Sequence, residues 1–474
     1  MRFPKMAFTT AGSALFSLDL LLVAVLWPAA LSFARPASLA PGLEPWDIRV
    51  VAYPAANFLF LYSMGMYRRD ALMDQRRTAG RIPLVVLMGA TLGFICPVLV
   101  ALFVSNAVPH YGGRDQAMMF GLAILVFILA AYFARAIFET LMSLRVLHRR
   151  LLVVGAGQRA YDLMHMLTRE GSNLHYDIVF VDHPPIGDID PRLSSQPGVR
   201  IIRMGEGGVL EMAQSTRADE IVVAPDDRRG MDLQRLLDCK TSGYPVVDYL
   251  TFVENELRRI DIKRIEIGWL VFSDGFTYGA VDRFLKRVFD LVVSLAVLLV
   301  GAIPLIFGMV AIRFEGPGPI FYRQERVTRG GKVFWILKLR TMRTDAESSG
   351  AVWAATGDSR ITKVGNFLRR TRIDELPQLL NILKGEMSFV GPRPERPIFV
   401  AELAEKIPLY NERHIVKAGL TGWAQVNYPY GASVDDARSK LSYDLYYVKN
   451  FSILFDFAIL LQTLREVLWP SGAR

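Results

Sequence analysis

Residues 291–312 read LVVSLAVLLVGAIPLIFGMVAI, a run of 22 consecutive uncharged residues. At about 1.5 Å per residue, such a helix is long enough to cross the roughly 30 Å hydrocarbon core of a bilayer. Pro304 lies inside the run, where it removes a backbone hydrogen bond and bends the helix. Cations stand on both sides, Lys286 and Arg287 before the run and Arg313 after it. The stretch is therefore expected to enter a membrane, either as a kinked span or as a broken helix that returns to its side of entry.

Four more apolar runs precede this stretch, and each approaches the ~20 residues that a membrane-spanning helix needs. They cover about 11–33, 51–67, 82–104 and 117–134. A removable signal peptide is an alternative for the first run, but three more runs follow it and no small-residue cleavage site ends it. Asp19 interrupts the first run and is expected to face other helices rather than lipid. We therefore predict a four-helix transmembrane bundle over residues 1–145.

The loops predict the orientation of this bundle, because lysine and arginine collect on the cytoplasmic side of a membrane. Arginines cluster after the second and fourth runs, at Arg68, Arg69, Arg76, Arg77, Arg81, Arg145, Arg149 and Arg150. Both ends of the bundle are then cytoplasmic. A fifth full crossing would put everything after residue 312 outside the cell. We therefore favour a re-entrant helix at about 288–312, which keeps the C-terminal part in the cytoplasm.

The composition excludes an ordinary soluble enzyme. The chain has 474 residues, of which 52% are hydrophobic and 21% charged, and its mean hydropathy is +0.26. The net charge of +9 suits anionic lipid or phosphate-rich substrates. No basic low-complexity tail or zinc-finger spacing supports nucleic acid. Cys96 and Cys239 are the two cysteines and cannot form a disulfide framework, which fits a cytoplasmic catalytic part.

Residues 146–250 alternate short strands with helices and predict a Rossmann-like domain. Strands are expected at 151–154, 178–181, 220–223 and 245–249. The first is followed by the glycine turn of Gly155 and Gly157, and the second ends at Asp182, placed to meet a ribose hydroxyl. One interpretation is a nucleotide-binding site. The other, which we favour, is a fold that keeps these glycines for packing, because no set of groups for hydride transfer follows the turn. A charged connector over 251–280 comes next.

The adjacent carboxylates Asp374 and Glu375 are the strongest candidates for chemistry. They lie in TRIDELPQLLN, residues 371–381, with arginines concentrated on both sides at Arg360, Arg369, Arg370, Arg372, Arg393 and Arg396. Acids among fixed cations suit a phosphorylated substrate with a divalent metal and a nucleophile. Alternatively the pair begins a helix at Asp374, with Pro377 in its first turn and an apolar face of Leu376, Leu379, Leu380 and Leu383. The two interpretations are compatible, since a helix start attracts phosphate.

Six segments in the last third of the chain occur in a characteristic order. They are GPGPIFYRQER at 316–326, KLRTM at 338–342, DSRIT at 358–362, TRIDELPQLLN at 371–381, GEMSFVGPRPE at 385–395 and KAGLTGWAQVN at 417–427. In this order they resemble the bacterial sugar transferase family of membrane phosphoglycosyl transferases, over about 281–470. The four preceding helices and the Rossmann-like domain resemble its large, polyprenyl-phosphate hexose-1-phosphate transferase branch. The implied fold class is membrane α plus α/β, with a C-terminal α/β catalytic domain over 281–474.

The resemblance implies a reaction and assigns residues to it. The family transfers hexose 1-phosphate from a UDP-hexose to undecaprenyl phosphate, releasing UMP, at the bacterial inner membrane, and so begins exopolysaccharide or O-antigen synthesis. The position of Asp374 implies a nucleophile and that of Glu375 a ligand of Mg²⁺. Substrate phosphates would be bound by Lys338, Arg340, Arg360, Arg372 and Arg393. Residues expected near lipid headgroups are Lys286, Arg287, Asp290 and Pro304.

Two other classes of function compete with this one. A membrane-anchored nucleotide sensor or scaffold subunit of a polysaccharide assembly complex would use the glycine turn as its receptor. It leaves the carboxylates and arginines of 360–396 unexplained. A transporter of lipid-linked sugars is disfavoured by the charge of the last third. A dimer is typical of similar large enzymes. UDP-glucose or UDP-galactose is the leading donor by resemblance, although the sequence does not choose between these and an N-acetylated sugar.

Overall fold

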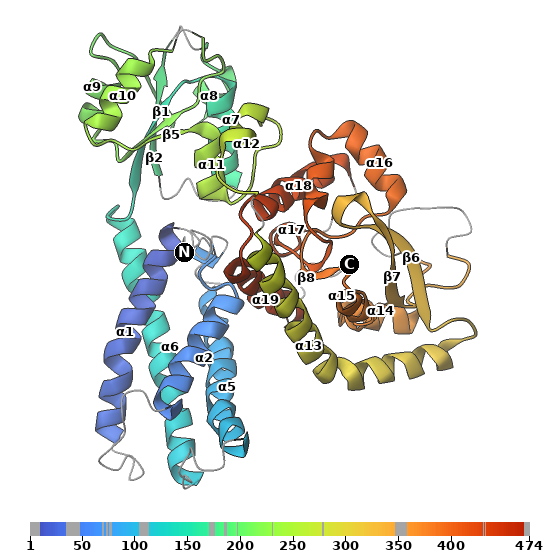
Figure 1. Ribbon diagram of the computed structural model, residues 1–474. Coiled ribbons are helices and arrows are strands. Elements are labelled where there is room, and N and C mark those ends of the chain that lie inside the picture. Colours follow the sequence, from blue (N-terminus) through green and yellow to red (C-terminus); the bar gives the residue numbers. More distant parts are fainter. Residues whose placement is uncertain are drawn as a thin grey trace. The chain divides into compact units, whose positions relative to one another are not determined.

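The computed structural model describes residues 10–34, 48–68, 71–72, 74, 78–103, 113–169, 176–183, 187–196, 198–229, 231–276, 279–346, 358–429, 431 and 433–468. The chain separates into two compact units, with the division between Leu257 and Arg258. The first holds an apolar helical bundle and a parallel sheet, and the second holds the carboxylate pair (Figure 1).

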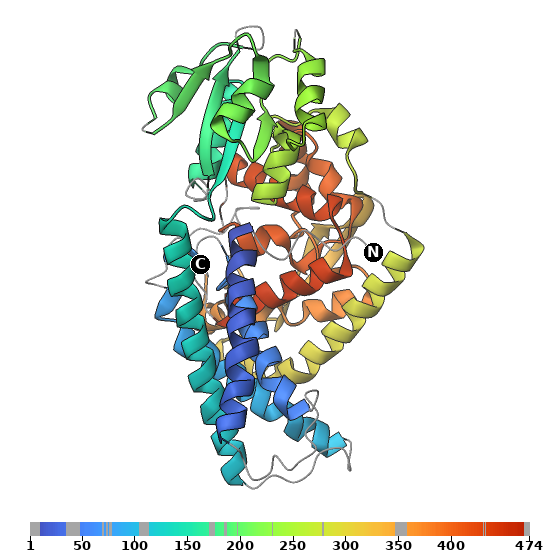
Figure 2. The ribbon, with the colours of Figure 1, turned by 90° about the vertical axis from the view of Figure 1, so that its left-hand side faces the viewer.

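The bundle consists of apolar helices that pack in pairs. They are α1 Thr10–Ala34, α2 Ile48–Ser63, α5 Ile82–Phe103 and α6 Gly113–Ser143. Helix α2 packs on α5, and α1 lies along α6 (Figure 1, Figure 2). By length and composition, α1 and α6 could cross a membrane. The described apolar stretches of the other two helices are shorter, Val50–Ser63 in α2 and Ile82–Val98 in α5. The four membrane crossings therefore stay a prediction. The predicted orientation also stays one, and it rests partly on Arg69, Arg76 and Arg77, which lie outside the described residues.

Asp19 is buried inside this bundle, as its position in an apolar run predicts. It is 1% exposed, and its Oδ2 lies 3.5 Å from Nη1 of Arg135 on α6. Trp27, Tyr53 and Phe127 pack in the apolar core of the same bundle. Charged groups within an apolar bundle are costly unless paired, so this ion pair fixes α1 against α6.

The sheet has five parallel strands in the order β3-β2-β1-β4-β5, which is the order of doubly wound α/β folds. The strands are β1 Arg149–Val154, β2 Tyr176–Asp182, β3 Arg200–Arg203, β4 Glu220–Val223 and β5 Val246–Asp248. Helices α9 Gly208–Thr216 and α10 Leu233–Thr241 cover one face (Figure 1). Helices α7 Gln158–Arg169, α8 Pro191–Ser194 and α11 Tyr249–Leu257 lie on the other. Four strands were expected from sequence, and β3 was not.

The second unit begins with α12 Ile267–Phe272 and the long helix α13 Ala280–Glu315. An antiparallel hairpin of β6 Phe321–Val327 and β7 Val333–Leu339 follows. Short helices and a two-stranded parallel ladder complete it: α14 Lys363–Arg370, α15 Gln378–Lys384, β8 Ser388–Val390, α16 Pro397–Lys406, β9 Gly419–Thr421, α17 Trp423–Asn427, α18 Val434–Lys449 and α19 Ile453–Leu468. Their shared core gathers Leu379, Met387, Tyr447 and Phe455.

Helix α13 has one face against this unit and one exposed apolar face. The buried positions are Asp290, Ser294, Gly301, Gly308 and Ile312, which recur at helical spacing. A side chain at Gly301 would meet Leu376, and one at Gly308 would meet Leu339 and Leu368, so the helix lies closely along the unit. Its axis changes direction partway (Figure 1), and it contains Pro304. The helix is long and apolar enough to cross a membrane, and the re-entrant path stays a prediction.

The predicted helix start at Asp374 is wrong. Residues Ile373–Glu375 form a 3₁₀ turn, and α15 begins at Gln378, directly after Pro377. Leu379 is fully buried, but Leu380 is 44% exposed, so the predicted apolar face is also partly wrong. The turn is entered through Arg372 at φ 58°, a left-handed conformation that separates α14 from the carboxylates.

Candidate active site

Glu375 is a buried carboxylate surrounded by cations from three segments. Its Oε1 lies 3.2 Å from Nζ of Lys338, on β7, and 3.1 Å from Nη2 of Arg393, which follows β8. Its Oε2 lies 3.7 Å from Nη1 of Arg372. Burial alone would raise the pKa of Glu375, but the positive charges of these three side chains outweigh it and lower the pKa. Glu375 is therefore ionised at neutral pH.

Asp374 has the opposite environment, although it is the next residue in the chain. It is 6% exposed, and its Oδ1 has no hydrogen-bond partner within the described part of the chain. Burial, followed by the negative charge of Glu375, raises the pKa of Asp374 to about 6. Two neighbouring carboxylates with separated pKa values indicate different roles for the two groups. Oδ1 of Asp374 therefore makes no hydrogen bond of the kind that a helix cap would make within the described residues.

Asn381 fixes the distance between Lys338 and the carboxylates. It lies on α15, where its Oδ1 accepts a hydrogen bond from the Leu337 amide at 3.0 Å. Its Nδ2 donates to the Trp335 carbonyl at 2.8 Å. Strand β7 pairs with β6 on its other side, so the amide of Asn381 takes the place of a neighbouring strand. Lys338 is thereby tied to the helix that follows Glu375.

Arg393 is oriented by two further side chains. Its Nη1 donates to Oε1 of Gln425 at 2.9 Å. Its carbonyl accepts from Nη2 of Arg413 at 2.9 Å, and that guanidinium is paired with the buried Asp444 at 2.7 Å. Both the backbone and the guanidinium of Arg393 are therefore held, which leaves its charge directed at Glu375 and suits a fixed phosphate contact.

Two of the predicted phosphate-binding arginines make other bonds. Arg340 donates to the carbonyls of Pro317 and Gly316 at 2.8 and 3.0 Å, at the C-terminal end of α13. Arg360 pairs with Asp358 at 2.5 Å and donates to the Ala346 carbonyl. Of the five predicted cations, the structure thus brings Lys338, Arg372 and Arg393 to Glu375. Arg340 and Arg360 have contacts of a kind that order the surrounding loops.

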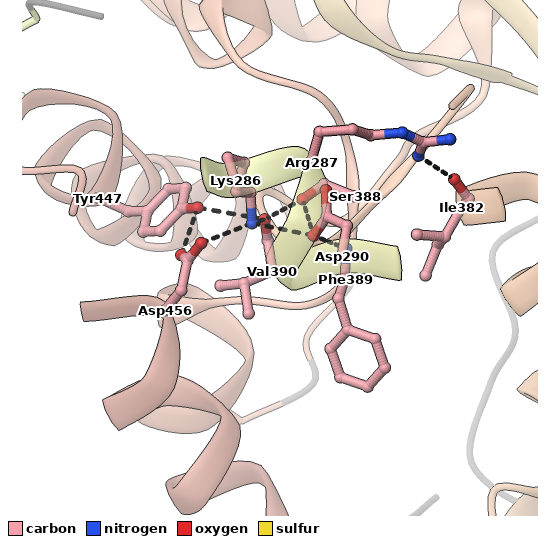
Figure 3. Close-up of polar contacts among 9 residues, drawn as sticks. All are labelled: Lys286, Arg287, Asp290, Ile382, Ser388, Phe389, Val390, Tyr447 and Asp456. Carbon is pink, nitrogen blue, oxygen red and sulfur yellow. Dashed lines mark hydrogen bonds and ion pairs between the residues drawn. The ribbon is translucent and has the colours of Figure 1, made fainter. Parts of the chain in front are cut away.

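The residues expected near lipid headgroups have internal partners (Figure 3). Lys286 lies 2.6 Å from Oδ2 of Asp456 and 3.3 Å from Oδ1 of Asp290. Asp290 also accepts from the Ser388 hydroxyl and the Phe389 amide, both at 2.9 Å.

Arg287 donates to the carbonyls of Ile382 and Leu383 at 2.6 Å and so caps the end of α15. These contacts join the first turns of α13 to the segments on both sides of the site. Pro304 lies farther along α13, in its apolar part.

The glycine turn of the parallel sheet is occupied by a side chain of the protein. The carboxylate of Asp226 accepts hydrogen bonds from the amides of Gln158 and Arg159, at 2.6 and 2.8 Å. A side chain at Gly157 would collide with that carboxylate, and one at Gly155 with the Ala224 carbonyl. The amides that would meet a dinucleotide phosphate are therefore used internally. Asp182, at the end of β2, belongs to the same edge of the sheet.

Other residues contribute to the site, and the sequence marked some of them. Arg369 lies among the cations that lower the pKa of Asp374, and its Nε donates to Oγ1 of Thr341. Asn381 and Arg413 act across long sequence separations; Asn381 closes the segment 371–381, but that pattern does not show its contact with β7, and Arg413 lies outside the six segments. Gln425 lies in the last of the six motif segments, which is the one signal that pointed to it.

The donor set around the carboxylates fits a magnesium ion that also binds substrate phosphate. Within the described ranges there is no group of three or more His, Cys, Asp or Glu side chains that could hold a metal alone. Mg²⁺ commonly takes one or two carboxylates, with waters and substrate phosphates completing its shell. Glu375 meets that requirement, since among the described residues its Oε2 has only the 3.7 Å contact with Arg372.

Comparison with known proteins gives consistent matches. The model of a family described as bacterial sugar transferase matches residues 281–470. The chain is 38% identical over 265 residues to a UDP-N-acetylgalactosamine-undecaprenyl-phosphate N-acetylgalactosaminephosphotransferase of Aeromonas hydrophila, covering 55% of this chain and 61% of that protein. It is 42% identical over 190 residues to the exopolysaccharide production protein PSS of Rhizobium leguminosarum bv. phaseoli, covering 39% of this chain and 95% of that protein.

A third relative is a UDP-glucose:undecaprenyl-phosphate glucose-1-phosphate transferase of Escherichia coli (strain K12). The identity is 39% over 188 residues, covering 39% of this chain and 40% of that protein. The matched segments thus span about three fifths of the Aeromonas relative and two fifths of the Escherichia relative. The carboxylates and the three cations that meet at Glu375 all lie within the family match.

Proposed function

The chain belongs to the bacterial sugar transferase family, and on that basis we propose that it transfers a sugar 1-phosphate to undecaprenyl phosphate. Two of the relatives described above are named for this reaction with different sugars, N-acetylgalactosamine and glucose. The proposed donor is a UDP-hexose and the released product is UMP. The proposed pathway role is the first membrane step of exopolysaccharide or O-antigen synthesis.

The observation that carries the proposal is the contrast between the two carboxylates. Glu375 is neutralised by Lys338, Arg372 and Arg393, whereas Oδ1 of Asp374 is buried without a partner in the described residues. A carboxylate nucleophile needs an oxygen that is not occupied, close to cations that accept the charge of a phosphate. The cations are already gathered by Glu375, so the site is organised before substrate arrives.

In the first step, an oxygen of Asp374 attacks the phosphorus that carries the sugar. A new bond forms between that oxygen and phosphorus, the bond from phosphorus to the bridging oxygen breaks, and UMP leaves with the electron pair. Aspartyl phosphates are established intermediates in phosphoryl transfer. Lys338 and Arg393 balance charge on the transferring group, because they are fixed within reach of it.

In the second step, a phosphate oxygen of undecaprenyl phosphate attacks the same phosphorus. The bond to Asp374 breaks and the carboxylate is restored, which gives undecaprenyl-diphospho-sugar. The proton balance is simple, because attacking and leaving groups are both oxyanions. The mechanism accordingly needs no general base.

We assign Glu375 as the protein ligand of Mg²⁺, with oxygens of the substrate diphosphate as the other ligands. When bound, the ion would offset negative charge on the diphosphate. The three cations that hold Glu375 orient its carboxylate for this purpose. Lys338 and Arg393 both donate to Oε1 of Glu375, which holds the carboxylate in one orientation.

We further propose that α13 is re-entrant and that the site works at the cytoplasmic face of the inner membrane. Positions from Asp290 to Ile312 pack against one and the same unit. A helix that crossed completely would carry its two ends to opposite faces, which is difficult for a helix in contact with one polar domain along its length. Leu376, next to the carboxylates, packs near Gly301 in the middle of α13, so a lipid phosphate beside this helix would be near Asp374.

The test is UMP release from UDP-sugars by the full chain in membranes, with undecaprenyl phosphate and Mg²⁺ supplied. The panel contains the UDP forms of glucose, galactose, N-acetylglucosamine and N-acetylgalactosamine. Asp374→Asn is expected to abolish release for whichever sugar is active. Asp435→Asn is the matched control, because Asp435 is an exposed carboxylate on α18. Full activity of Asp374→Asn would refute the catalytic assignment.

A further inference from the structure

A cavity of about 270 Å³ lies beside the first turns of α13. None of Lys338, Asp374, Glu375 or Arg393 lines it, so it is separate from the proposed active site. Its lining includes two carboxylates and five cations, namely Arg283, Lys286, Arg287, Arg329 and Lys417. The excess of positive charge indicates an anionic ligand.

Part of this charge is balanced within the protein. Lys286 is neutralised by Asp456 and Asp290, and its Nζ also donates to the Val390 carbonyl at 3.0 Å (Figure 3). Arg287 donates to two carbonyls at the end of α15 but forms no ion pair with a carboxylate in the described part of the chain. The cavity therefore has no excess of positive charge at Lys286, whereas Arg287 gives it a positive wall.

Lys417 and Arg329 are two of the three remaining cations. Neither has a hydrogen bond or ion pair with the rest of the described chain. Lys417 is partly buried, and burial together with the nearby Arg287 lowers its pKa. A side-chain atom placed on Gly385 would lie 3.6 Å from Nζ of Lys417 and 3.7 Å from Nη2 of Arg287. The two cations thus flank one point, and Asp290 offsets only part of their repulsion, since the pKa of Lys417 is still lowered.

We propose that this cavity binds a phosphate group between Lys417, Arg287 and Arg329. Phosphate presents several acceptor oxygens, which matches donors that come from three segments: α13, the β6–β7 turn and the segment before β9. The shared chemistry is that of a phosphate ester. Its source is either the headgroup of a membrane lipid or a soluble phosphate.

The surroundings of the cavity suit an amphipathic ligand. Val390, Ile415, Val416 and Phe451 contribute apolar surface to its lining. On α13, Val281 and Phe284 are 69% and 68% exposed beside it. A phosphate held by the cations could therefore carry an apolar chain along α13, as basic pockets that bind lipid headgroups do.

Occupation of the cavity would also act on the proposed active site. Arg287 faces the cavity and caps α15, and α15 follows Glu375 after two residues. A phosphate that removes the repulsion around Arg287 would stabilise this cap. The proposal does not depend on the reaction proposed for Asp374, because it requires binding alone.

The test measures thermal unfolding of the full chain in two arms. In one, nanodiscs contain phosphatidylcholine alone or with increasing phosphatidic acid. In the other, detergent-solubilised protein is titrated with inorganic phosphate at constant ionic strength. The variant is Arg329→Gln/Lys417→Gln. The control is Lys332→Gln/Lys406→Gln, which removes equal charge at residues that do not line the cavity.

We expect both wild type and control to be stabilised by the ligand, and the cavity variant to lose about tenfold in apparent affinity for each cation removed. If the cavity variant loses affinity in the lipid arm, the ligand is a lipid headgroup. If it loses affinity in the phosphate arm, the ligand is a soluble phosphate. Equal responses of wild type and cavity variant in both arms would overturn the proposal. Arg329 is exposed, so Arg329→Gln alone provides the test if Lys417→Gln lowers the yield of folded protein. UMP release by the same variants separates this result from the catalytic proposal.

Discussion

The ammonium of Lys338 lies 3.2 Å from Oε1 of Glu375, although 36 residues separate the two in sequence. This contact joins strand β7 to the turn that carries Asp374. Burial lowers the pKa of Lys338, but the negative charge of Glu375 opposes that effect. The contact therefore places Lys338 beside the turn that carries the proposed nucleophile, and the roles of the remaining residues can be tested around it.

The pH dependence of kcat/KM should report the ionisation of Asp374, since this parameter follows the free enzyme. Burial and Glu375 raise the pKa of Asp374 to about 6, so the protonated, inactive form prevails below that pH. We expect the rate to fall about tenfold for each pH unit below 6 and to be level just above it. UMP release measured from pH 4.5 to 8 checks this. A profile that stays level down to pH 4.5 would contradict the assignment.

Replacing Arg393 should reduce catalysis more than binding of the protein to the membrane. Arg393→Met removes a fixed cation from the charge that develops on phosphate, for which a loss of about 10²–10³ in kcat is expected. Initial rates of UMP release and co-sedimentation with vesicles measure the two properties. Arg396→Met removes the same charge three residues away, beside the ring of Phe399. Equal loss in both variants would indicate a general charge effect.

Asn381 should position Lys338. Asn381→Ala leaves the Leu337 amide and the Trp335 carbonyl without their partner, which costs about 1–3 kcal/mol of stability for a buried group. We expect a lower melting temperature together with a lower kcat, because Lys338 is no longer held against Glu375. The control is Asn366→Ala on the exposed side of α14. Unchanged kcat in a destabilised but folded Asn381→Ala protein would limit Asn381 to a structural role.

The re-entrant path of α13 predicts that both of its ends are cytoplasmic. A single cysteine near Asp345, introduced after replacement of Cys96 and Cys239, should react with a membrane-impermeant maleimide only once the inner membrane is opened. Cysteines in the loop before α13 should behave in the same way. Labelling near Asp345 from the periplasm would show a complete crossing instead.

Features marked by local patterns were predictable from the sequence. The runs of β1, β2 and β4 are continuous and apolar, and an aspartate inside an apolar run requires a partner such as Arg135. Strand β3 has two isoleucines between two arginines, which is too short for a pattern. The carboxylates Asp374 and Glu375 were found because they lie in one of six motif segments that occur in a characteristic order.

Tertiary contacts decided what the sequence could not. Pro377 made a helix start at Asp374 plausible, but the left-handed Arg372 and the pairing of Glu375 with β7 hold residues 373–375 in a 3₁₀ turn. Arg340 and Arg360 stood in motifs but bond to nearby carbonyls and to Asp358. Asn381 ends the segment that carries the carboxylates, but its role depends on a strand more than 40 residues earlier.

The central claim, a covalent bond between Asp374 and the transferred phosphate, is tested most directly by the mass of the intact protein. The full chain is mixed with its UDP-sugar and Mg²⁺ in the absence of undecaprenyl phosphate, and then quenched in acid. We predict an added mass of one sugar phosphate, mapped to Asp374, lost when undecaprenyl phosphate is added and absent in Asp374→Asn. An adduct on another residue, or one of equal yield in Asp374→Asn, would contradict the account.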